Sequence, residues 1–486
     1  MAEQSKRLHP LKIPFEMWNV LKKEFFLIIL LYVLNFGTEK VYMIVLQLIY
    51  LLYFVWKVIS LTLNWFTYTY HIKEGNIQIK SGLISKSYRT VPLHKIQNVQ
   101  RRTTVLHKFF HLTSLTFETG MTGDQGSVLF EAISLKEAQR LETEFSSQEI
   151  PAVEENHLEE DSLKETGAEQ TIHFTPTKRD VLKASFTSLS FLAIIPIVAT
   201  IYKTLDDFFN LENAEGAVAS FLNSWLTITI ALIVLVGLAI GFGIISTFVK
   251  YGKYEISSDA KRVYIKKGVL DESAFSIQKE KVQAVEITQS LIKRMLGLAE
   301  VKLISAGSTG DEKLETNTLY PFLSVDRAHA IIEEILPSYK VERSMHPLSK
   351  QAFIVRMLRP SYLWIVVTVA IFIFKPAIWY ISLILFVLIY TSRIIDYKNG
   401  RYLLHDEFIQ FKSGSLETSL FITKRSKVIQ IKVERSRLQK RFGLASIETI
   451  NRSKPVHHTK LQDVSLEYAD EFYTWYIDRT KNIQVE

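Results

Sequence analysis

The sequence predicts an α+β membrane protein built from three tandem units, each a transmembrane helical hairpin followed by a small β-rich polar domain that ends in a helix. One stretch of about forty residues occurs three times without gaps, which is the signature of an internal repeat. Each copy is preceded by a pair of apolar runs suited to membrane helices. The apolar share of the whole chain, 48%, is also more than a soluble domain ordinarily needs.

The repeated stretch begins at a glycine and keeps its spacing in every copy. Thirteen residues after the glycine stands a lysine, and a second basic residue follows thirteen residues later. These positions are Gly82, Lys95 and Lys108 in the first copy, Gly268, Lys281 and Arg294 in the second, and Gly414, Lys427 and Lys440 in the third. The stretch then closes on a turn that holds Gly297 or Gly443, with His111 in the first copy.

Composition excludes several classes of function. The chain has no cysteine, so disulfides, thiolate metal sites and cysteine nucleophiles are ruled out. A net charge of +8 is modest for 486 residues, and bulk nucleic-acid binding is therefore not expected. No phosphate-cradling glycine loop, serine elbow or matched pair of nucleophile and base is found, so we expect neither an enzyme nor a bound cofactor.

Six membrane spans are the simplest interpretation of the apolar runs. They cover residues 25–36, 41–63, 181–201, 221–249, 358–374 and 376–392. The first is short unless it recruits residues before Lys22, and a re-entrant first helix stays open. The basic start of the chain resembles a signal peptide, but no small-residue cleavage site follows, which favours a retained hairpin.

These spans divide the chain into seven segments. The hairpins occupy 1–63, 177–250 and 341–392, the polar domains occupy 64–148, 251–340 and 393–486, and residues 149–176 form an acidic linker. The linker has almost no large apolar side chains, so we expect it to be flexible, with a docking role as the alternative.

Lysine and arginine gather on one side of the predicted membrane. Basic residues flank the outer ends of the hairpins, at Lys22, Lys23, Lys250, Lys253, Arg356, Arg359 and Arg393. The three hairpin tips hold only Lys40, Lys203 and Lys375. The positive-inside rule then places both termini and all three polar domains in the cytoplasm.

Each polar domain has alternating strand patterns and one closing helix. We expect short antiparallel strands to form a meander, with turns at the repeat glycines. Ser134, Ser324 and Ser465 precede an acid in the first turn and are predicted helix N-caps. In the second domain Val325, Ala328, Ile331, Ile332 and Ile335 share a face that can cover a barrel end or one side of a sheet.

At these residues the chain resembles the bacterial pleckstrin-homology-like (PH-like) domains of the YdbS/YdbT family. The resemblance is carried by Val91 to Val99, VPLHKIQNV, and by Gln289 to Leu298, QSLIKRMLGL. It implies a seven-stranded barrel-like sandwich closed by a C-terminal helix, a place in the plasma membrane, and a smaller one-unit relative as partner. His111 and the segment Thr423 to Arg425 depart from the family pattern.

The basic residues around the motif are the main functional candidates, as a surface for anionic lipid or for a partner membrane protein. They are Lys95, Arg101, Arg102, Lys108, Lys281, Lys293, Arg294, Lys424, Arg425, Lys427, Arg437, Lys440 and Arg441. Beneath an anionic leaflet each would gain about 1 kcal/mol. The alternative is that they are solvated faces of strands and helices. The apolar motif residues are expected in the domain cores: Leu106, Phe110, Ile292, Leu296, Leu438 and Phe442.

Other patterns carry weaker hypotheses. His107 and His111 have the spacing of two metal ligands on a helix, but no carboxylate stands between them and no metal site is expected. Gly237 and Gly241 favour close helix packing, within the chain or in a dimer. Transport or export through the hairpins is the alternative function, although the spans lack clustered charges. We expect a role in envelope stress or in tolerance to membrane-active peptides.

Overall fold

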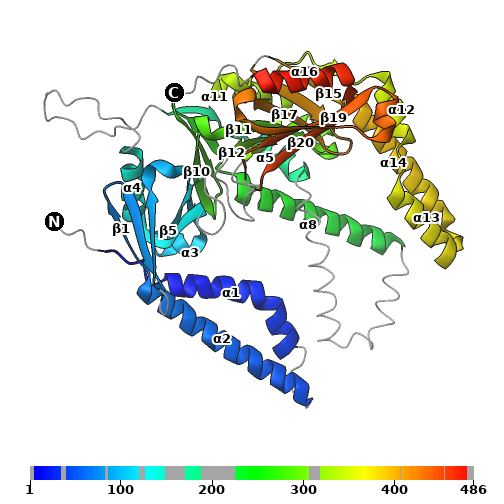
Figure 1. Cartoon of the computed structure of the whole chain (residues 1–486). Coiled ribbons are helices and arrows are strands. Elements are labelled where there is room, and N and C mark those ends of the chain that lie inside the picture. The colour runs from blue at the N-terminus through cyan, green and yellow to red at the C-terminus, as the bar shows by residue number, and fades with distance from the viewer. Residues whose placement is uncertain are drawn as a thin grey trace, which may run out of the picture. The chain divides into compact units, whose positions relative to one another are not determined.

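The computed structural model describes residues 5–33, 40–82, 86–119, 126–147, 170–187, 225–305, 318–405, 407–453 and 455–478. The chain folds into two compact units (Figure 1). The first holds residues 1–166 together with Leu270–Phe275, and the second holds the remainder. Most of the predicted acidic linker, residues 149–169, lies outside the described residues.

The first compact unit contains the first hairpin and the first polar domain, here called module 1. Helix α1 (Lys12–Ile28) continues as a π-helix (Ile29–Val33) and runs beside α2 (Val41–Thr67) (Figure 1). One sheet has the order β1 (Thr69–Lys73), β2 (Asn76–Ser81), β3 (Ser87–Pro92). Strands β4 (Ile96–Thr103), β5 (Leu112–Thr119) and β6 (Ser127–Ser134) form the second. Helix α4 (Leu135–Ser147) closes the module.

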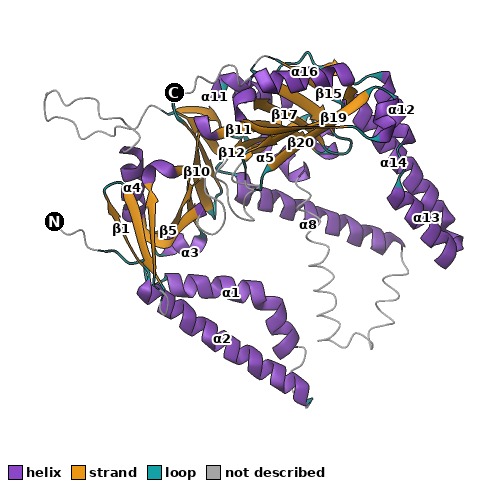
Figure 2. Ribbon diagram, in the orientation of Figure 1, coloured by secondary structure: helices purple, strands orange, loops and turns teal. Residues whose placement is uncertain are grey.

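The second compact unit contains modules 2 and 3 with their predicted hairpin helices, except for residues 270–275 of module 2, which belong to the first unit. Module 2 is built from β7 (Thr171–Phe174), β8 (Glu255–Ser258), β9 (Arg262–Lys267), β10 (Glu272–Gln278), β11 (Val282–Gln289), β12 (Leu298–Ser305), β13 (Thr318–Ser324) and α11 (Val325–Ile335). Module 3 is built from β14 (His346–Pro347), β15 (Arg401–Leu404), β16 (Phe408–Ser413), β17 (Thr418–Lys424), β18 (Val428–Glu434), β19 (Leu444–Asn451), β20 (His457–Ser465) and α16 (Leu466–Ile477). Figure 2 shows the helices of this unit flanking its sheets.

Seven strands per module are confirmed in modules 2 and 3, but the modules are not separate closed barrels. In the second unit one sheet has the order β13-β12-β11-β17-β16-β15-β14, so the second half of module 2 continues into the first half of module 3. The junction is the antiparallel pair β11–β17, from Ala284 opposite Thr423 to Gln289 opposite Thr418. In the first unit β4 likewise lies between β5 and the start of β10.

The closing helices cover the sheets with the residues that their periodicity predicts. In α11 Ala328, Ile331, Ile332 and Ile335 are buried, whereas Val325 is half-buried. The N-cap prediction holds at Ser465, whose side chain accepts from the Tyr468 amide, and at Ser134, which accepts from Glu137. Ser324 also occupies the N-cap position of α11, but its side chain accepts no capping hydrogen bond.

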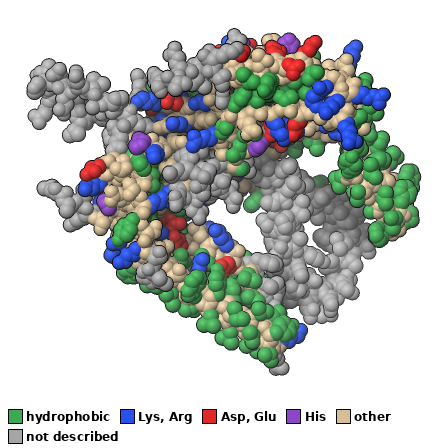
Figure 3. All heavy atoms as spheres, viewed as in Figure 1, with side chains coloured by type: hydrophobic (Ala, Val, Ile, Leu, Met, Phe, Trp, Pro, Cys, Tyr) green, Lys and Arg blue, Asp and Glu red, His purple; other side chains and the backbone are tan. Residues whose placement is uncertain are grey.

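Three helical segments of the described chain are long and apolar enough to cross a membrane: Val41–Thr67, Lys350–Phe374 and Pro376–Asn399. The last two comprise α12 (Lys350–Leu358), α13 (Tyr362–Phe374) and α14 (Trp379–Asn399). In the second hairpin only α5 (Lys178–Thr187) and α8 (Trp225–Tyr251) are described, so the third predicted span lies largely outside the described residues. Apolar side chains coat the long helices (Figure 3).

A short segment before each membrane section pairs with the first strand after it. Lys6 bridges to Tyr70 of β1, β7 pairs with β8, and β14 pairs with β15. These segments, here called the entry segments, contain or adjoin His9-Pro10, His173 and His346-Pro347, a His-Pro pair that occurs before the first and third predicted hairpins and only in part before the second. The chain therefore leaves each module and returns to the same sheet, which fixes both ends of the membrane section at one place.

Candidate functional site

The repeated motif folds as a strand, a one-turn helix and a left-handed residue. The helices are α3 (Val105–Phe109), α9 (Leu291–Met295) and α15 (Arg437–Arg441), here called the motif helices. Each begins at a hydroxyl side chain that accepts from a backbone amide in the first turn, namely Thr104, Ser290 or Ser436. Each ends at His111, Gly297 or Gly443, with φ of 54°, 66° and 66°.

Every motif helix lies near a helix of its own predicted hairpin. The ring of His107, in α3, is 4.6 Å from Phe15 of α1. Lys293 of α9 sits over the ring of Phe322, which contacts Tyr251 at the end of α8. Gln439 of α15 donates to Asp463, which is also bound by Arg356 of α12. The motif therefore marks the end of each module that adjoins its predicted hairpin, here called the membrane-facing end, which the sequence did not indicate.

A buried ionic network joins the third hairpin to module 3. The carboxylate of Asp463, fully buried, accepts from Arg356 Nε at 3.1 Å and from Arg359 Nη2 at 3.0 Å. Arg356, only 5% exposed, also donates to Asp396 of α14 at 2.7 Å. Arg393 donates to the carbonyls of Arg356 and Arg359. In the sequence, Arg356, Arg359 and Arg393 served only to predict membrane orientation. The structure shows that they also connect module 3 to the helices of the third hairpin.

The predicted basic surface is divided between two ends of the modules. Strand β17 starts near the membrane helices, because Ser392 of α14 donates to Ser415 and Asp396 accepts from the Gly414 amide. It then runs for seven residues, roughly 20 Å at about 3.3 Å per residue, before it reaches the turn at Lys427. That distance is about twice the screening length in physiological salt. The basic residues at this membrane-distal end are Lys281, Lys424, Arg425 and Lys427, and Lys95 occupies the same turn in module 1.

Several of the predicted basic residues are engaged within the protein. Arg101 pairs with Glu142, Lys108 with Glu272 at 2.8 Å, and Lys293 with Glu300 at 2.7 Å. Arg294 donates to the Ser415 carbonyl, Arg425 to Trp475, and Lys427 to Glu280, while Lys424 lies over the ring of Tyr339. Arg102 is half-buried in β4, whereas Lys95 and Lys281 are exposed. Many of these cations therefore serve as internal or intermodule contacts.

Lysines crowd together at the junction of modules 2 and 3. Burial, and then the charges of Lys424 and Lys281, lower the pKa of Lys427. Burial alone would raise the pKa of Glu300, but Lys293 and Lys302 beside it hold that pKa below its usual range. The two ends of the modules therefore differ in their electrostatics. The lysines at the membrane-distal end repel one another, whereas the charge of Lys293 at the membrane-facing end is balanced by Glu300.

Three predicted basic residues stay exposed at the membrane-facing end of module 3. Arg437, Lys440 and Arg441 project from α15, and their side chains make no hydrogen bond or ion pair that we observe with the described residues. They lie on one turn of helix beside the Asp463 network. Of the predicted set, these residues are exposed on the motif helix of module 3.

The expectation that the apolar motif residues belong to the cores is wrong for modules 1 and 2. Leu106, Phe110 and Leu296 are 42%, 43% and 45% exposed. Their neighbours Phe109 and Met295 are 78% and 79% exposed. Leu438 and Phe442 do pack against the core of module 3 as expected, and Ile292 is half-buried. A one-turn helix presents too little surface to bury all its apolar residues, so the membrane-facing ends of modules 1 and 2 are apolar.

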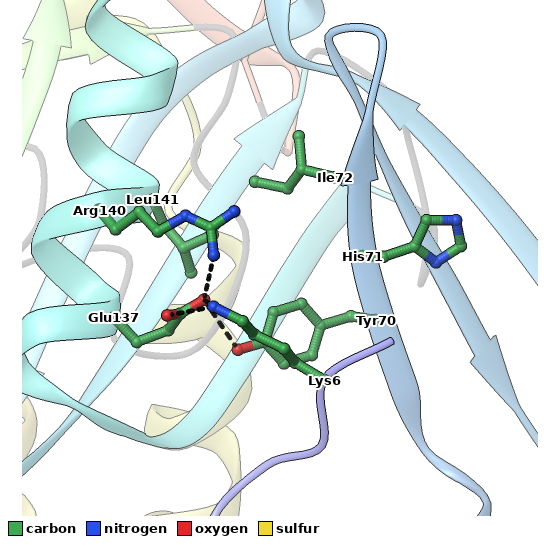
Figure 4. A pocket seen from close by; sticks show the side chains of 7 residues that line it. All are labelled: Lys6, Tyr70, His71, Ile72, Glu137, Arg140 and Leu141. Atoms are coloured by element: carbon green, nitrogen blue, oxygen red, sulfur yellow. Dashed lines mark hydrogen bonds and ion pairs between the residues drawn. The ribbon is translucent and has the colours of Figure 1, made fainter. Parts of the chain in front are cut away.

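Module 1 is tied to its own hairpin by two sets of charges. Lys12, the first residue of α1, is 3.2 Å from Glu16 and 3.6 Å from Glu131 of β6. Burial, and then the adjacent Glu16 carboxyl, raise the pKa of Glu131 to about 8. The second set lies at the N-terminal segment, where Glu137 accepts from Lys6 at 2.8 Å beside Arg140, in a pocket of about 190 Å³ (Figure 4). Because these charges satisfy one another, we assign the pocket no ligand.

Polar groups inside the hairpins also lock helices together. Glu24 of α1, an acid that sequence reasoning overlooked, accepts from both Tyr50 and Tyr53 of α2, and Gln47 donates to the Leu31 carbonyl. In the third hairpin Thr368 and Ser382 share a hydrogen bond. These groups bind each other across each hairpin, which explains them without a transported solute.

The structure also bears on the metal-site hypothesis for His107 and on the helix-packing hypothesis for Gly237 and Gly241. The two ring nitrogens of His107 bond to Thr104 and to the Glu131 carbonyl, so neither faces a metal. At Gly237 and Gly241 an added Cβ would meet nothing within 4 Å, so the described residues provide no packing partner there. The predicted partner span lies mostly outside the described residues.

Comparison with known proteins decides the family. The family model described as "Bacterial PH domain" matches three times, over residues 25–149, 193–338 and 362–480. The chain belongs to the bacterial PH domain family. Each match includes helix as well as sheet, and the three matches agree with three PH-like repeats.

A full-length relative is known from Bacillus subtilis (strain 168). The chain is 24% identical to its "UPF0699 transmembrane protein YdbT" over 98% of this chain and 99% of that protein. The two chains therefore align over almost their whole lengths. No solved structure matches.

Proposed function

We propose that this chain is a non-enzymatic multipass protein of the bacterial plasma membrane, whose PH-like modules rest against anionic headgroups through their motif helices and bind a partner membrane protein. The observation that carries the proposal is the repeated position of the motif helix beside a helix of its own predicted hairpin. Exposed Phe109 and Met295 suit the interface in modules 1 and 2, and exposed Arg437 and Arg441 suit headgroups in module 3.

The pairing of the entry segments supports six crossings with every module in the cytoplasm. Because both ends of each membrane section are held on one sheet, each section crosses an even number of times. The absence of cysteine makes a clean test possible. Single cysteines at Lys40 and Lys375, at the hairpin tips, should react with an impermeant maleimide on intact cells, and a cysteine at Glu74 should react only after lysis. Labelling of Glu74→Cys on intact cells would refute the orientation.

Lipid contact of the motif helices is tested by spin labels on the full chain in nanodiscs. A label on Phe109→Cys or Met295→Cys should collide with oxygen, which concentrates in lipid, more than with a water-soluble nickel chelate. A label on Glu74→Cys, in the turn between β1 and β2, provides the aqueous control. Equal, water-like accessibility at all three positions would refute the interfacial contact.

Headgroup selection is tested in module 3. The double variant Arg437→Gln/Arg441→Gln should weaken retention of phosphatidylglycerol over phosphatidylcholine in native mass spectrometry by about an order of magnitude, at about 1 kcal/mol per cation near the surface. The matched control is Lys95→Gln/Lys281→Gln at the membrane-distal end, which should leave retention unchanged. If the control lowers retention and the α15 double variant does not, the membrane-facing assignment fails.

A role in envelope stress or peptide tolerance follows from the location. A strain that lacks the gene should show increased sensitivity to cationic membrane-active peptides, with restoration by the wild-type gene but not by the Arg437→Gln/Arg441→Gln variant. Unchanged sensitivity across a panel of such peptides would refute this role.

A further inference from the structure

The strands that follow the repeat lysines have two neighbours in modules 1 and 2 but one in module 3. Strand β11 lies between β12 and β17, and β4 lies between β5 and the start of β10. In both cases the second neighbour is the strand that immediately precedes the repeat lysine of the next module, β17 before Lys427 and β10 before Lys281. Strand β18 occupies the same repeat position, yet among the described strands it pairs only with β19. Among the described residues, module 3 therefore has only one of the two strands that form this junction in modules 1 and 2.

The side chains of β18 are exposed where their counterparts in β11 are buried. Val433 is 37% exposed, whereas Ile287, at the same repeat position, is 4% exposed. Ile429 is 51% exposed, and its counterpart Gln283 is 9% exposed. An unpaired edge strand with exposed apolar residues is a template for strand addition, which proteins ordinarily protect with charges or a cover.

In modules 1 and 2 a basic residue of the motif helix contacts the neighbouring strand or turn of the next module. The equivalent residue of module 3 makes no such contact among the described residues. Twenty-six residues after the repeat glycine, Lys108 pairs with Glu272 at 2.8 Å, and Arg294 donates to the Ser415 carbonyl at 3.0 Å. Glu272 is the first residue of β10, and Ser415 lies in the turn before β17. Both contacts are therefore made with the following module. Lys440 holds this position in module 3, and its ammonium group has no such contact among the described residues.

We propose that β18 is a docking edge for a strand of a PH-like module on a separate polypeptide, the one equivalent to β10 and β17. This inference rests on the proposed function, because it names the partner membrane protein by its chemistry. Such a strand would add antiparallel to β18 in the register of β11 and β17, with its backbone groups bonded to the free edge. At the far end of β18 the Ile429 carbonyl is already bonded by the Tyr476 hydroxyl, so pairing starts at Gln430.

Charge decides against a second copy of this chain. The matching edge of module 1 is β3, which pairs only with β2 among the described strands. In the β11–β17 register Val433 would face Tyr88, but Lys432 would face Arg89 and Arg435 would face Lys86. Like charges directly opposite each other destabilise a strand pair.

A strand with the chemistry of β10 fits instead. At the positions opposite Lys432 and Arg435, β10 has Phe275 and Glu272. Glu272 would also reach Lys440, as it reaches Lys108 in the first compact unit. The partner strand is therefore apolar at its centre, uncharged opposite Lys432 and acidic at its start.

The experiment traps this pairing by disulfide formation, with a synthetic peptide that spans residues 270–280 as the probe. The full chain in nanodiscs carries Val433→Cys or Lys432→Cys, and the peptide carries Ala274→Cys or Phe275→Cys at the facing position. One of two adjacent pairs in an antiparallel ladder is the non-hydrogen-bonded kind, whose short separation suits a disulfide. We expect one matched pair to crosslink, and a peptide of scrambled sequence with the same cysteine not to.

Charge variants and two alternative occupants complete the test. Lys440→Glu should lower the matched yield about two- to five-fold, and a peptide with Glu272→Lys should restore it, in line with the strength of surface ion pairs. Yields equal to those of the scrambled peptide would overturn the proposal. Two other outcomes would assign the edge differently. Preferential crosslinking of Val433→Cys to Tyr88→Cys of a second copy would assign the edge to self-association. A peptide crosslink that forms only when the chain is shortened to end at Asp478 would assign the edge to the chain's own C-terminus. Headgroup selection by Arg437 and Arg441 is measured separately, so either proposal can fail alone.

Discussion

At the residue scale, Asp463 is the position on which module 3 most depends. Its carboxylate is fully buried and joins Arg356, Arg359 and Gln439 in a backbone conformation with φ of 65°. Asparagine also tolerates the left-handed region, so Asp463→Asn removes the charge with little change in backbone preference. Sequence reasoning overlooked this residue because it is an ordinary acid before a helix, and only the fold shows its partners.

We predict that Asp463→Asn destabilises module 3 by about 3–5 kcal/mol, because it leaves Arg356 buried with a diminished counter-charge. Hydrogen exchange of the β19 and β20 amides in nanodiscs measures the effect. The control is Asp470→Asn, at an exposed position on α16. Equal protection in the two variants would contradict the prediction.

A second residue-scale prediction concerns pH. Because the pKa of Glu131 is raised to about 8, the folded module holds this proton at pH values where the unfolded chain has lost it. Its contribution to stability is therefore complete below the ordinary glutamic acid pKa and is lost as pH rises through about 8.

The variant Glu131→Gln should flatten this fall in the stability of module 1 between about pH 5 and 9. The lowered pKa of buried His107 acts in the opposite direction, at acid pH, and is common to both proteins. Exchange rates of the β5 and β6 amides, measured against pH in wild type and in Glu131→Gln, provide the comparison. Glu74→Gln, on an exposed turn, is the control, and parallel pH profiles for wild type and Glu131→Gln would contradict the assignment.

At the scale of elements, the repeat predicted the motif's turns more accurately than its environment. His111 departs from the family pattern in residue type but not in backbone conformation. Its φ is 54°, in the same left-handed region as Gly297 and Gly443, whose φ is 66°. The spacing of residues determines where a helix must end. It does not say which side of the helix meets a membrane, since Phe109 and Met295 have the composition of core residues but lie 78% and 79% exposed.

The turn conformation yields a reciprocal prediction. His111→Gly should stabilise module 1 and Gly443→Ala should destabilise module 3, each by about 1 kcal/mol, because the left-handed region costs a side-chain-bearing residue that much. An added Cβ at Gly443 meets nothing within 4 Å, so the expected loss is conformational rather than steric. Thermal unfolding of the two variants measures it, and a stabilising Gly443→Ala would be inconsistent with the assigned backbone.

At the scale of the whole molecule, the sequence predicted three repeats, their membrane helices and their closing helices, but not how the modules join. Periodicity within one copy is the same whether its strands close on themselves or pair with a neighbour. The pairing of β11 with β17 depends on residues about 130 positions apart, such as Glu286 and Ser419, whose hydrogen bond spans the junction. For the same reason, the sequence did not predict that some of the basic residues contact a neighbouring module.

A shared sheet should make modules 2 and 3 unfold together. Phe421 of β17 is 1% exposed and belongs to the same core cluster as Ala284 and Ile304 of module 2. Phe421→Ala should therefore cost about 3–5 kcal/mol and accelerate hydrogen exchange in β12 as well as in β16. The matched control, Phe130→Ala in the core of module 1, should accelerate exchange in β5 and β6. If Phe421→Ala accelerated exchange in module 3 alone, β17 would be an edge that merely touches module 2, and β18 would lose its precedent as a strand acceptor.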